Sequence, residues 1–395
     1  MELASKIAQV QKDLQKEGID GWLFYDFRKA NDLACQFLEI HEEVLTRRFF
    51  YWLPAHGEPI KLLNPVEPHV LSHLPGKDIL YSSWHNLEVC LKDILQNQKR
   101  IAMEYSPRNA IPYVSKVDAG TMEVIKSFGV DVVTSANLLQ KYDSVWTQDQ
   151  INSHYRAADV LDKTVAKAWD MIGQALKSGQ RITEYEVQQF IADEIQKNGC
   201  IFEGGPFVDV GVNSANPHYC PSKEIHAVIN KHDFILIDLW CKENKQGAVY
   251  ADITRVGVAD TKATERQEEI FSIVKQARDE ATKLVKERFA NKQDVMGWEV
   301  DAKAREVIEK AGYGKYFTHR TGHNIHTKDH GNGAHIDNLE TQDKRKIIPG
   351  TCFSIEPGIY IPGEFGVRLE YDIFIDHNSN VHVTGGIQNE ITCVL

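Results

Sequence analysis

Two aspartates, Asp238 and Asp252, lie in apolar surroundings in the middle of the chain. Asp238 interrupts a nearly unbroken apolar run at residues 234–240, a pattern typical of a strand buried on both faces. Asp252 lies in the next apolar segment, beyond a polar turn. A buried ionised carboxylate is costly unless it is paired, neutralised or bound to a cation. Two such acids on neighbouring strands favour a shared multivalent cation. The alternative is that one caps a turn and the other pairs with Arg255.

Three later segments carry side chains of the same chemistry. His323 belongs to a histidine-rich stretch, Glu356 ends an apolar strand before Pro-Gly, and Glu370 lies in another apolar strand. With the two aspartates they supply four carboxylates and one imidazole, and clustered anions repel one another unless cations lie between them. An oxygen-rich set with one histidine favours Mn²⁺, Co²⁺, Fe²⁺ or Zn²⁺ over a thiolate site. Two such ions about 3.5–4 Å apart can hold a bridging hydroxide.

In order and setting, these five residues resemble the ligands of the pita-bread metallopeptidases, the family of Xaa-Pro aminopeptidase, Xaa-Pro dipeptidase, methionine aminopeptidase and creatinase. Asp252 stands in Tyr-Ala-Asp-Ile-Thr-Arg, His323 follows Thr-Gly, Glu356 stands in Ile-Glu-Pro-Gly-Ile-Tyr and Glu370 ends Val-Arg-Leu-Glu. The resemblance implies two divalent metal ions, manganese first, with cobalt, zinc or iron as alternatives. It places Asp238 and Asp252 on one ion, and Asp252, Glu370, His323 and Glu356 on the other.

The resemblance also implies which side chains handle the substrate. His218 resembles the histidine that contacts substrate near the metals, and His319 resembles one that lines the far side of the pocket. His330 resembles the histidine that hydrogen-bonds the scissile carbonyl or its oxyanion. Glu356 is the expected proton shuttle, and Arg368 resembles an arginine that orients substrate or neighbouring acids. Taken alone, each histidine would more often be an ordinary surface or core residue, and Arg368 one half of a salt bridge.

Other interpretations of these segments concern zinc and thiol ligands. His319 and His323 are four residues apart, as in a helical zinc pair, but the glutamate that defines such a motif is replaced by Arg320. Cys220 and Cys241 lie close to the predicted site and are alternative soft ligands. The chain also departs from the family pattern, with a longer turn at 242–247, His326 in place of a glycine-rich run, and Gly331 where an acid usually follows the histidine. His326 and His335 are expected to be pocket wall or surface.

Composition limits the class of protein. At 395 residues the chain is long for one core, so two domains are expected. A formal net charge of -11 argues against nucleic acid as the main partner, and no apolar run approaches the length of a membrane span. The N-terminus reads as an amphipathic helix ended by Gly18 rather than a signal peptide. Seven scattered cysteines without a CxxC pattern favour a reducing, cytoplasmic location.

The order of predicted elements supports an α/β domain at residues 1–145 followed by an α+β pita-bread domain at 146–395. Strands are predicted at 21–27, 48–53, 60–63, 101–105 and 130–133, with helices between them. Capping boxes at 147–150 and 183–186 begin two helices that end at Gly179 and Gly199. Further helices are predicted at 264–288 and 301–311. We expect helices to cover one face of a curved, largely antiparallel sheet. The first domain resembles the N-terminal domain of the creatinase and prolidase branch, which methionine aminopeptidases lack.

The resemblance therefore implies a dinuclear exopeptidase that cleaves between an N-terminal residue and a following proline. The resemblance also implies short proline-containing peptides as substrates and a homodimer as the assembly. Whether it is an aminopeptidase or a dipeptidase stays open, because that depends on how the pocket closes behind the proline. The alternatives are a creatinase-like amidinohydrolase, which works without metals, and a non-catalytic pita-bread module that binds peptides or proteins. Both should have lost ligands that this chain keeps.

Overall fold

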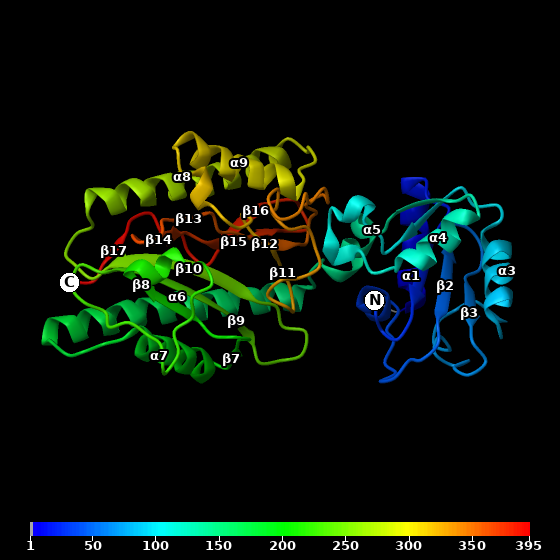
Figure 1. Cartoon of the computed structure of the whole chain (residues 1–395), viewed down its shortest axis with the longest axis horizontal. Coiled ribbons are helices and arrows are strands. Elements are labelled where there is room, and N and C mark those ends of the chain that lie inside the picture. Colours follow the sequence, from blue (N-terminus) through cyan, green and yellow to red (C-terminus); the bar gives the residue numbers. More distant parts are fainter. Residues whose placement is uncertain (1–2) are drawn as a thin grey trace. The chain divides into compact units, whose positions relative to one another are not determined.

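The computed structural model describes residues 3–395. The chain divides into two compact units, Met1–Asp143, blue to cyan in Figure 1, and Ser144–Leu395. The boundary expected from the sequence lay between residues 145 and 146. In the part of the chain that the structure describes, no helix is long and apolar enough to cross a bilayer.

The first unit is an open α/β sheet of six strands in the order β4-β3-β2-β1-β5-β6. β2 runs antiparallel to both of its neighbours, and the other pairs are parallel. All carboxyl ends except that of β2 therefore lie along one edge. The strands are β1 (Gly21–Asp26), β2 (Phe49–Pro54), β3 (Ile60–Leu63), β4 (Lys77–Leu80), β5 (Arg100–Met103) and β6 (Asp131–Thr134).

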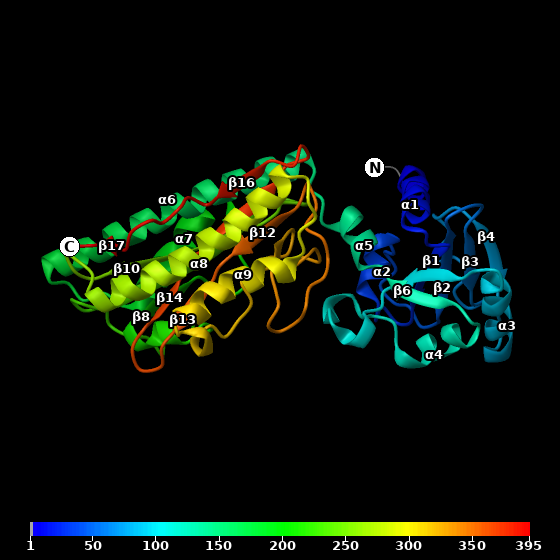
Figure 2. The same ribbon diagram turned by 90° about the horizontal axis from the view of Figure 1, so that it is seen from above.

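Helices cover both faces of this sheet. One apolar cluster joins α1 (Leu3–Glu17), α2 (Asp32–Phe37) and α5 (Ala136–Asp143) to one face, and another joins α3 (Trp84–Leu95) and α4 (Ala119–Ser127) to the opposite face. Figure 2 shows α1 and α4 on opposite sides of the strands. Two 3-10 turns, η1 (Pro107–Asn109) and η2 (Pro112–Val114), precede α4. The sequence did not predict α2, β4 or α5. β4 is mostly exposed, so it has no alternation of buried and exposed residues to detect.

The second unit is built from three small sheets. β9 (Phe234–Glu243) pairs antiparallel with β10 (Ala251–Val258), β7 (Cys200–Ile201) and β8 (Phe207–Val210), and β17 (Thr392–Cys393) pairs with β10. A second sheet has the order β11-β12-β15-β16, with β11 (Asn324–Ile325), β12 (Cys352–Ile355), β15 (Tyr371–Ile375) and β16 (Val381–Thr384). β13 (Gly358–Tyr360) and β14 (Gly366–Arg368) form a hairpin.

Helices lie on both sides of these sheets (Figure 1), which corrects the expectation that they cover one face. Phe234 and Leu236 pack with α8 (Glu265–Ala290) and α9 (Gly297–Lys310). Ile235 and Ile237 pack with α6 (Gln148–Ser178) and α7 (Glu184–Lys197) on the other side. Alternate side chains of a strand point to opposite faces, so packing against helices on both faces explains the unbroken apolar run of β9. Two 3-10 turns, η3 (Gly211–Ala215) and η4 (Gly314–Tyr316), complete the unit.

The ends of the long helix α6 follow local sequence signals. Thr147 and Gln150 cap its first turn reciprocally, as the sequence predicted. Gly179 ends it with φ of 72°, a left-handed conformation that favours glycine. α6 then covers β9 and β10, the two strands that carry the central aspartates.

Candidate metal centre

The pairing of β9 with β10 brings the two central aspartates onto one face of the sheet. Thr254 lies directly opposite Asp238, and Asp252 lies opposite Trp240. Residues two apart on a strand point to the same face, so Asp252 and Thr254 both share the face of Asp238. Arg255, three residues from Asp252, points to the other face. It contacts the carbonyl of Glu370 and the carboxylate of Asp162, so the alternative pairing of Arg255 with a central aspartate is wrong.

Three other predicted ligands reach this face from the second sheet. Ligand atoms of Asp252, His323 and Glu370 all lie within 4.8 Å of one another. His323 Nε2 lies 3.7 Å from Asp252 Oδ2 and 3.4 Å from Glu356 Oε1. These residues come from the strand β10, from just before β11, from just after β12 and from between β14 and β15. Segments up to 118 residues apart in sequence therefore meet at one point.

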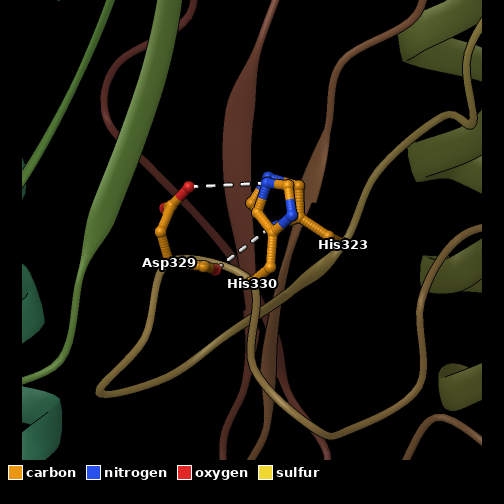
Figure 3. A group of neighbouring side chains, drawn as sticks. All are labelled: His323, Asp329 and His330. Carbon is orange, nitrogen blue, oxygen red and sulfur yellow. Dashed lines mark hydrogen bonds and ion pairs between the residues drawn. The ribbon is translucent and has the colours of Figure 1, made fainter. Parts of the chain in front are cut away.

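The ring of His323 is oriented by a backbone carbonyl. Its Nδ1 donates to the carbonyl oxygen of Asp329 at 3.1 Å, as Figure 3 shows. Since a carbonyl only accepts, Nδ1 carries the proton, and burial lowers the pKa of the ring well below its usual value. Nε2 is then a bare lone pair that faces two carboxylates. This lone pair and the oxygens of the two carboxyl groups are all acceptors, and a metal cation would satisfy all three.

Two carboxylate oxygens in this cluster have no hydrogen-bond donor among the described residues. They are Asp252 Oδ1 and Glu370 Oε1, on residues that are 5% and 2% exposed. Burial, and then the neighbouring acids, raise the pKa of both carboxyls well above the usual range. Burial also raises the pKa of Glu356 to about 7. These donor-free oxygens fit an oxygen-liganded divalent cation.

Asp238, the fifth predicted ligand, is held from the side by an arginine. Its Oδ2 accepts from Nη2 of Arg368 at 2.5 Å, and Thr254 Oγ1 lies 3.2 Å from its Oδ1. The same hydroxyl lies 2.6 Å from Glu370 Oε2 and accepts from Nε of Arg368 at 3.0 Å. Thr254 thus links Asp238 with Glu370, and Arg368 supplies the positive charge next to Asp238.

This donor set has a counterpart among known proteins. Residues 153–377, more than half of the chain, match the profile of metallopeptidase family M24. The chain belongs to this family. An uncharacterized peptidase of Staphylococcus epidermidis is 27% identical over 388 residues, which cover 95% of this chain and 97% of that protein.

Solved structures of similar proteins share the two-domain pita-bread architecture. A dipeptidase from Pyrococcus horikoshii is 26% identical, with a TM-score of 0.57 over 98% of this chain and 99% of that chain. A dipeptidase from Mycobacterium ulcerans has a TM-score of 0.68 at 21% identity, over 99% of this chain and 98% of that chain. The protein is therefore a metallopeptidase, and divalent metal ions are the cofactors of M24 metallopeptidases.

Two of the histidines predicted to handle substrate are exposed. His330 exposes 60% of its side chain, its ring centroid lies 4.0 Å from that of His323, and its Nδ1 accepts from Nη2 of Arg320. Figure 3 shows its other nitrogen toward the carboxylate of Asp329, at 3.6 Å. His218 is exposed on the segment after η3 and lies near enough to Asp238 to act on the pKa of that carboxyl, although burial, which raises this pKa, and Arg368, which lowers it, both have larger effects. Both histidines therefore lie near the predicted ligands and are open to solvent.

His319 is engaged within the protein. Its Nδ1 donates to the carbonyl of Arg320 at 2.6 Å, and its Nε2 accepts from the hydroxyl of Tyr360 at 2.7 Å. That hydroxyl in turn accepts from Nη1 of Arg368 at 3.0 Å. Burial lowers the pKa of His319 to about 3, so the ring is neutral. His319 is connected to Asp238 through Tyr360 and Arg368, and the alternative helical zinc pair with His323 fails because neither residue lies in a helix.

Sequence reasoning missed several side chains that support the cluster. Asp372 is fully buried, and its Oδ2 accepts from the backbone N–H of Asp252 at 2.9 Å. Tyr360 and Thr254 were inside recognised motifs, but only the polar type of their side chains hinted at a role. The expected position of His335 was wrong: it is fully buried, with Nδ1 accepting from the N–H of Asn324. The described chain has two groups of potential metal ligands, Asp252-His323-Glu370 and His323-Asp329-His330, and neither contains Cys220 or Cys241.

Proposed function

We propose that this M24 metallopeptidase is a dinuclear exopeptidase that hydrolyses the bond between an N-terminal residue and a following proline. The observation that carries the proposal is the buried cluster of Asp252, His323 and Glu370 with its donor-free oxygens. The names of similar solved structures support the substrate class. They include a prolidase from Thermococcus sibiricus, 24% identical with a TM-score of 0.60, and an X-Pro aminopeptidase from Thermotoga maritima, 21% identical with a TM-score of 0.58.

We assign each of the two ions to the ligands that the family resemblance implies. Asp238 and Asp252 would hold one, and Asp252, Glu370, His323 and Glu356 would hold the other, with manganese as the first choice. Bound divalent ions supply a water nucleophile at neutral pH and polarise the scissile carbonyl. Cations between the acids would also favour their ionised forms, which burial alone opposes.

The side chains around the cluster have separate roles in this mechanism. Glu356 takes the proton of the attacking water and passes it to the leaving imino nitrogen of proline. His330 and His218, which are exposed to solvent, donate hydrogen bonds to the oxygen of the scissile carbonyl as negative charge develops there. Arg368 and Tyr360 hold Asp238 in place through the contacts described above.

We also propose that the enzyme is a cytoplasmic homodimer. The seven cysteines are all free thiols, which supports a reducing compartment. Sedimentation of the purified protein tests the dimer, and cell fractionation tests the location.

Hydrolysis of two peptides tests the activity. Protein stripped of metal and reloaded with Mn²⁺ is given Ala-Pro and Ala-Pro-Ala, beside an Asp252→Asn variant. Cleavage of the dipeptide alone indicates a dipeptidase, and cleavage of the tripeptide indicates an aminopeptidase with room beyond proline. The metal content of both proteins is counted by mass spectrometry, with two ions per chain expected for the wild type. If neither peptide is cut with any divalent ion and both proteins bind equally little metal, the catalytic proposal fails and the binding-module alternative replaces it.

A further inference from the structure

The first unit contains a cavity of about 740 Å³ whose lining residues all belong to that unit. This volume lies within the range of roughly 300–1,000 Å³ typical of small-molecule sites. Tyr25 of β1 and Phe50 of β2 line it together with Leu87 of α3 and Ile125 of α4. The cavity therefore lies between the sheet on one side and two helices on the other, and part of it is open to solvent.

The cavity lies at a place where α/β sheets bind ligands. Tyr25 is at the carboxyl end of β1, and Asn64 and Tyr81 directly follow β3 and β4. Ser83 and Asp118, which cap the amino ends of α3 and α4, also line the cavity. In open parallel sheets, ligands bind outside the carboxyl ends of the strands, where helix amino ends favour negative charge.

An arginine gives the cavity a positive charge. Arg48 is half-buried, and within residues 3–395 its guanidinium makes no ion pair with a carboxylate. Its charge acts on the phenols of Tyr25 and Tyr81, against the larger effect of burial, which raises the pKa of Tyr25 to about 12. The nearby acid Asp118 is already engaged, because its two oxygens accept from the N–H and the hydroxyl of Thr121. Of the other charged residues that line the cavity, Arg47 and Glu88 are exposed, so Arg48 is the half-buried cation of the lining.

Two aromatic side chains in the lining are left open to solvent. Trp84 is 59% exposed and Phe27 is 42% exposed, although large apolar side chains are usually covered. The rings of Tyr25 and Phe50, which also line the cavity, are in contact, with centroids 4.9 Å apart and planes tilted by 36°. Such rings favour a planar apolar body, and an arginine favours an anionic group on it.

We propose that this cavity binds a small organic anion with a planar aromatic body. The guanidinium of Arg48 pairs with the anionic group, and the rings of Tyr25, Phe50 and Trp84 surround the body. The proposal concerns the first unit alone and does not depend on the peptidase activity of the second.

A matched pair of fluorescent probes tests this on the full chain. 8-Anilinonaphthalene-1-sulfonate carries an anionic sulfonate, and N-phenyl-1-naphthylamine has the same aromatic body without it. We expect one saturable site that binds the sulfonate about tenfold more tightly than the neutral probe, as a charge-assisted contact provides. Arg48→Ala should remove this preference and leave the affinity for the neutral probe unchanged.

Two further variants locate the site. Arg100→Ala removes the same charge at the opposite edge of the sheet, at the amino end of β5, and should change neither affinity. Val124→Trp fills the cavity from α4 and should abolish binding of both probes. Circular dichroism confirms that each variant is folded.

Three outcomes would overturn the proposal. If the wild type binds both probes with equal affinity, and Arg48→Ala does not change this, the cavity is an apolar patch without anion selectivity. Unchanged binding to the folded Val124→Trp variant would mean that the probes bind elsewhere. Sedimentation shows at which dilution the protein is a monomer. If the sulfonate binds only at such dilutions, a second copy of the chain covers the cavity.

Discussion

Both units bury acids, but their surroundings are opposite. In the first unit Glu104 is fully buried and accepts from Nε1 of Trp22 at 2.6 Å, from Nδ2 of Asn31 at 2.8 Å and from the hydroxyl of Ser135 at 3.2 Å. In the second unit, one oxygen each of Asp252 and Glu370 is buried without any donor in the described chain. Burial alone therefore does not identify a metal site. A lack of donors does not identify one alone either, because buried oxygens of Asp209 and Asp372 also have no donor among the described residues. Asp252 and Glu370 differ in that their oxygens also lie beside His323, within the reach of one ion.

The largest effect is expected at Asp252, one of the buried acids that has an oxygen without a donor. Asp252→Asn removes a carboxylate from the centre of the cluster and should lower kcat/KM for Ala-Pro or Ala-Pro-Ala by at least about a thousandfold, with loss of bound metal. Glu104→Gln, the matched change of a donor-saturated acid, should leave both quantities unchanged. Wild-type metal content in Asp252→Asn would contradict a metal role for this carboxylate.

Glu104, which accepts three hydrogen bonds, should instead make the free energy of unfolding depend on pH. Burial raises the pKa of Glu104 to about 7 from an ordinary value of 4.5, so the folded state holds the proton more tightly than the unfolded state does. Its stabilising contribution is complete below pH 4.5 and falls as the pH rises toward 7, by about 3 kcal/mol in total.

Urea unfolding of wild type and Glu104→Gln between pH 4 and pH 8 measures this loss. The free energy of unfolding of wild type, relative to that of the variant, should fall as the pH rises. A difference that stays constant over this range would show that three donors suffice to keep Glu104 ionised.

A third change weakens the hydroxyl that joins two predicted ligands. Thr254→Val keeps the shape of the side chain but removes the contacts of Oγ1 with Glu370 and Asp238. Loss of such supporting hydrogen bonds typically lowers metal affinity about 10–100-fold. Competition with a fluorescent chelator would measure the metal affinity of the variant. Thr164→Val, at a buried threonine of α6, is the control. Equal affinities of both variants would assign Thr254 a packing role only.

The smallest effect is expected at a donor-saturated acid of the second unit. Glu184 accepts from the N–H groups of Val210 and Ala227, from Nδ2 of Asn213 and from the hydroxyl of Tyr219. These donors enclose the segment that carries His218. Glu184→Gln replaces one accepting oxygen by a donor, so KM should rise up to about tenfold while metal content and kcat change little.

Glu186→Gln is the matched control, because Glu186 lies in the same first turn of α7. Among the described residues, its side chain forms a hydrogen bond only with Thr183. A parallel loss of metal in Glu184→Gln would instead place Glu184 among the supports of the metal cluster.

Local signals in the sequence predicted much of the fold. The capping residues Thr147 and Gln150 and the left-handed Gly179 bound α6 as expected, because their hydrogen bonds span only a few residues. The alternation of side chains along β10 also indicates which residues cannot pair. Asp252 and Arg255 are three residues apart and so must point to opposite faces, which already excludes their pairing.

The sequence by itself determined the residue types, their order and the strands that carry them, which sufficed for the family and for a metallopeptidase. Only the tertiary structure decided which buried acids have donors. Trp22 and Asn31 reach Glu104 from 82 and 73 residues away, and Arg368 reaches Asp238 from 130 residues away. Asp252 and Glu370 each keep one oxygen without such a partner. Because these contacts depend on how distant strands pack, no local pattern separates a satisfied buried carboxylate from one that needs a cation.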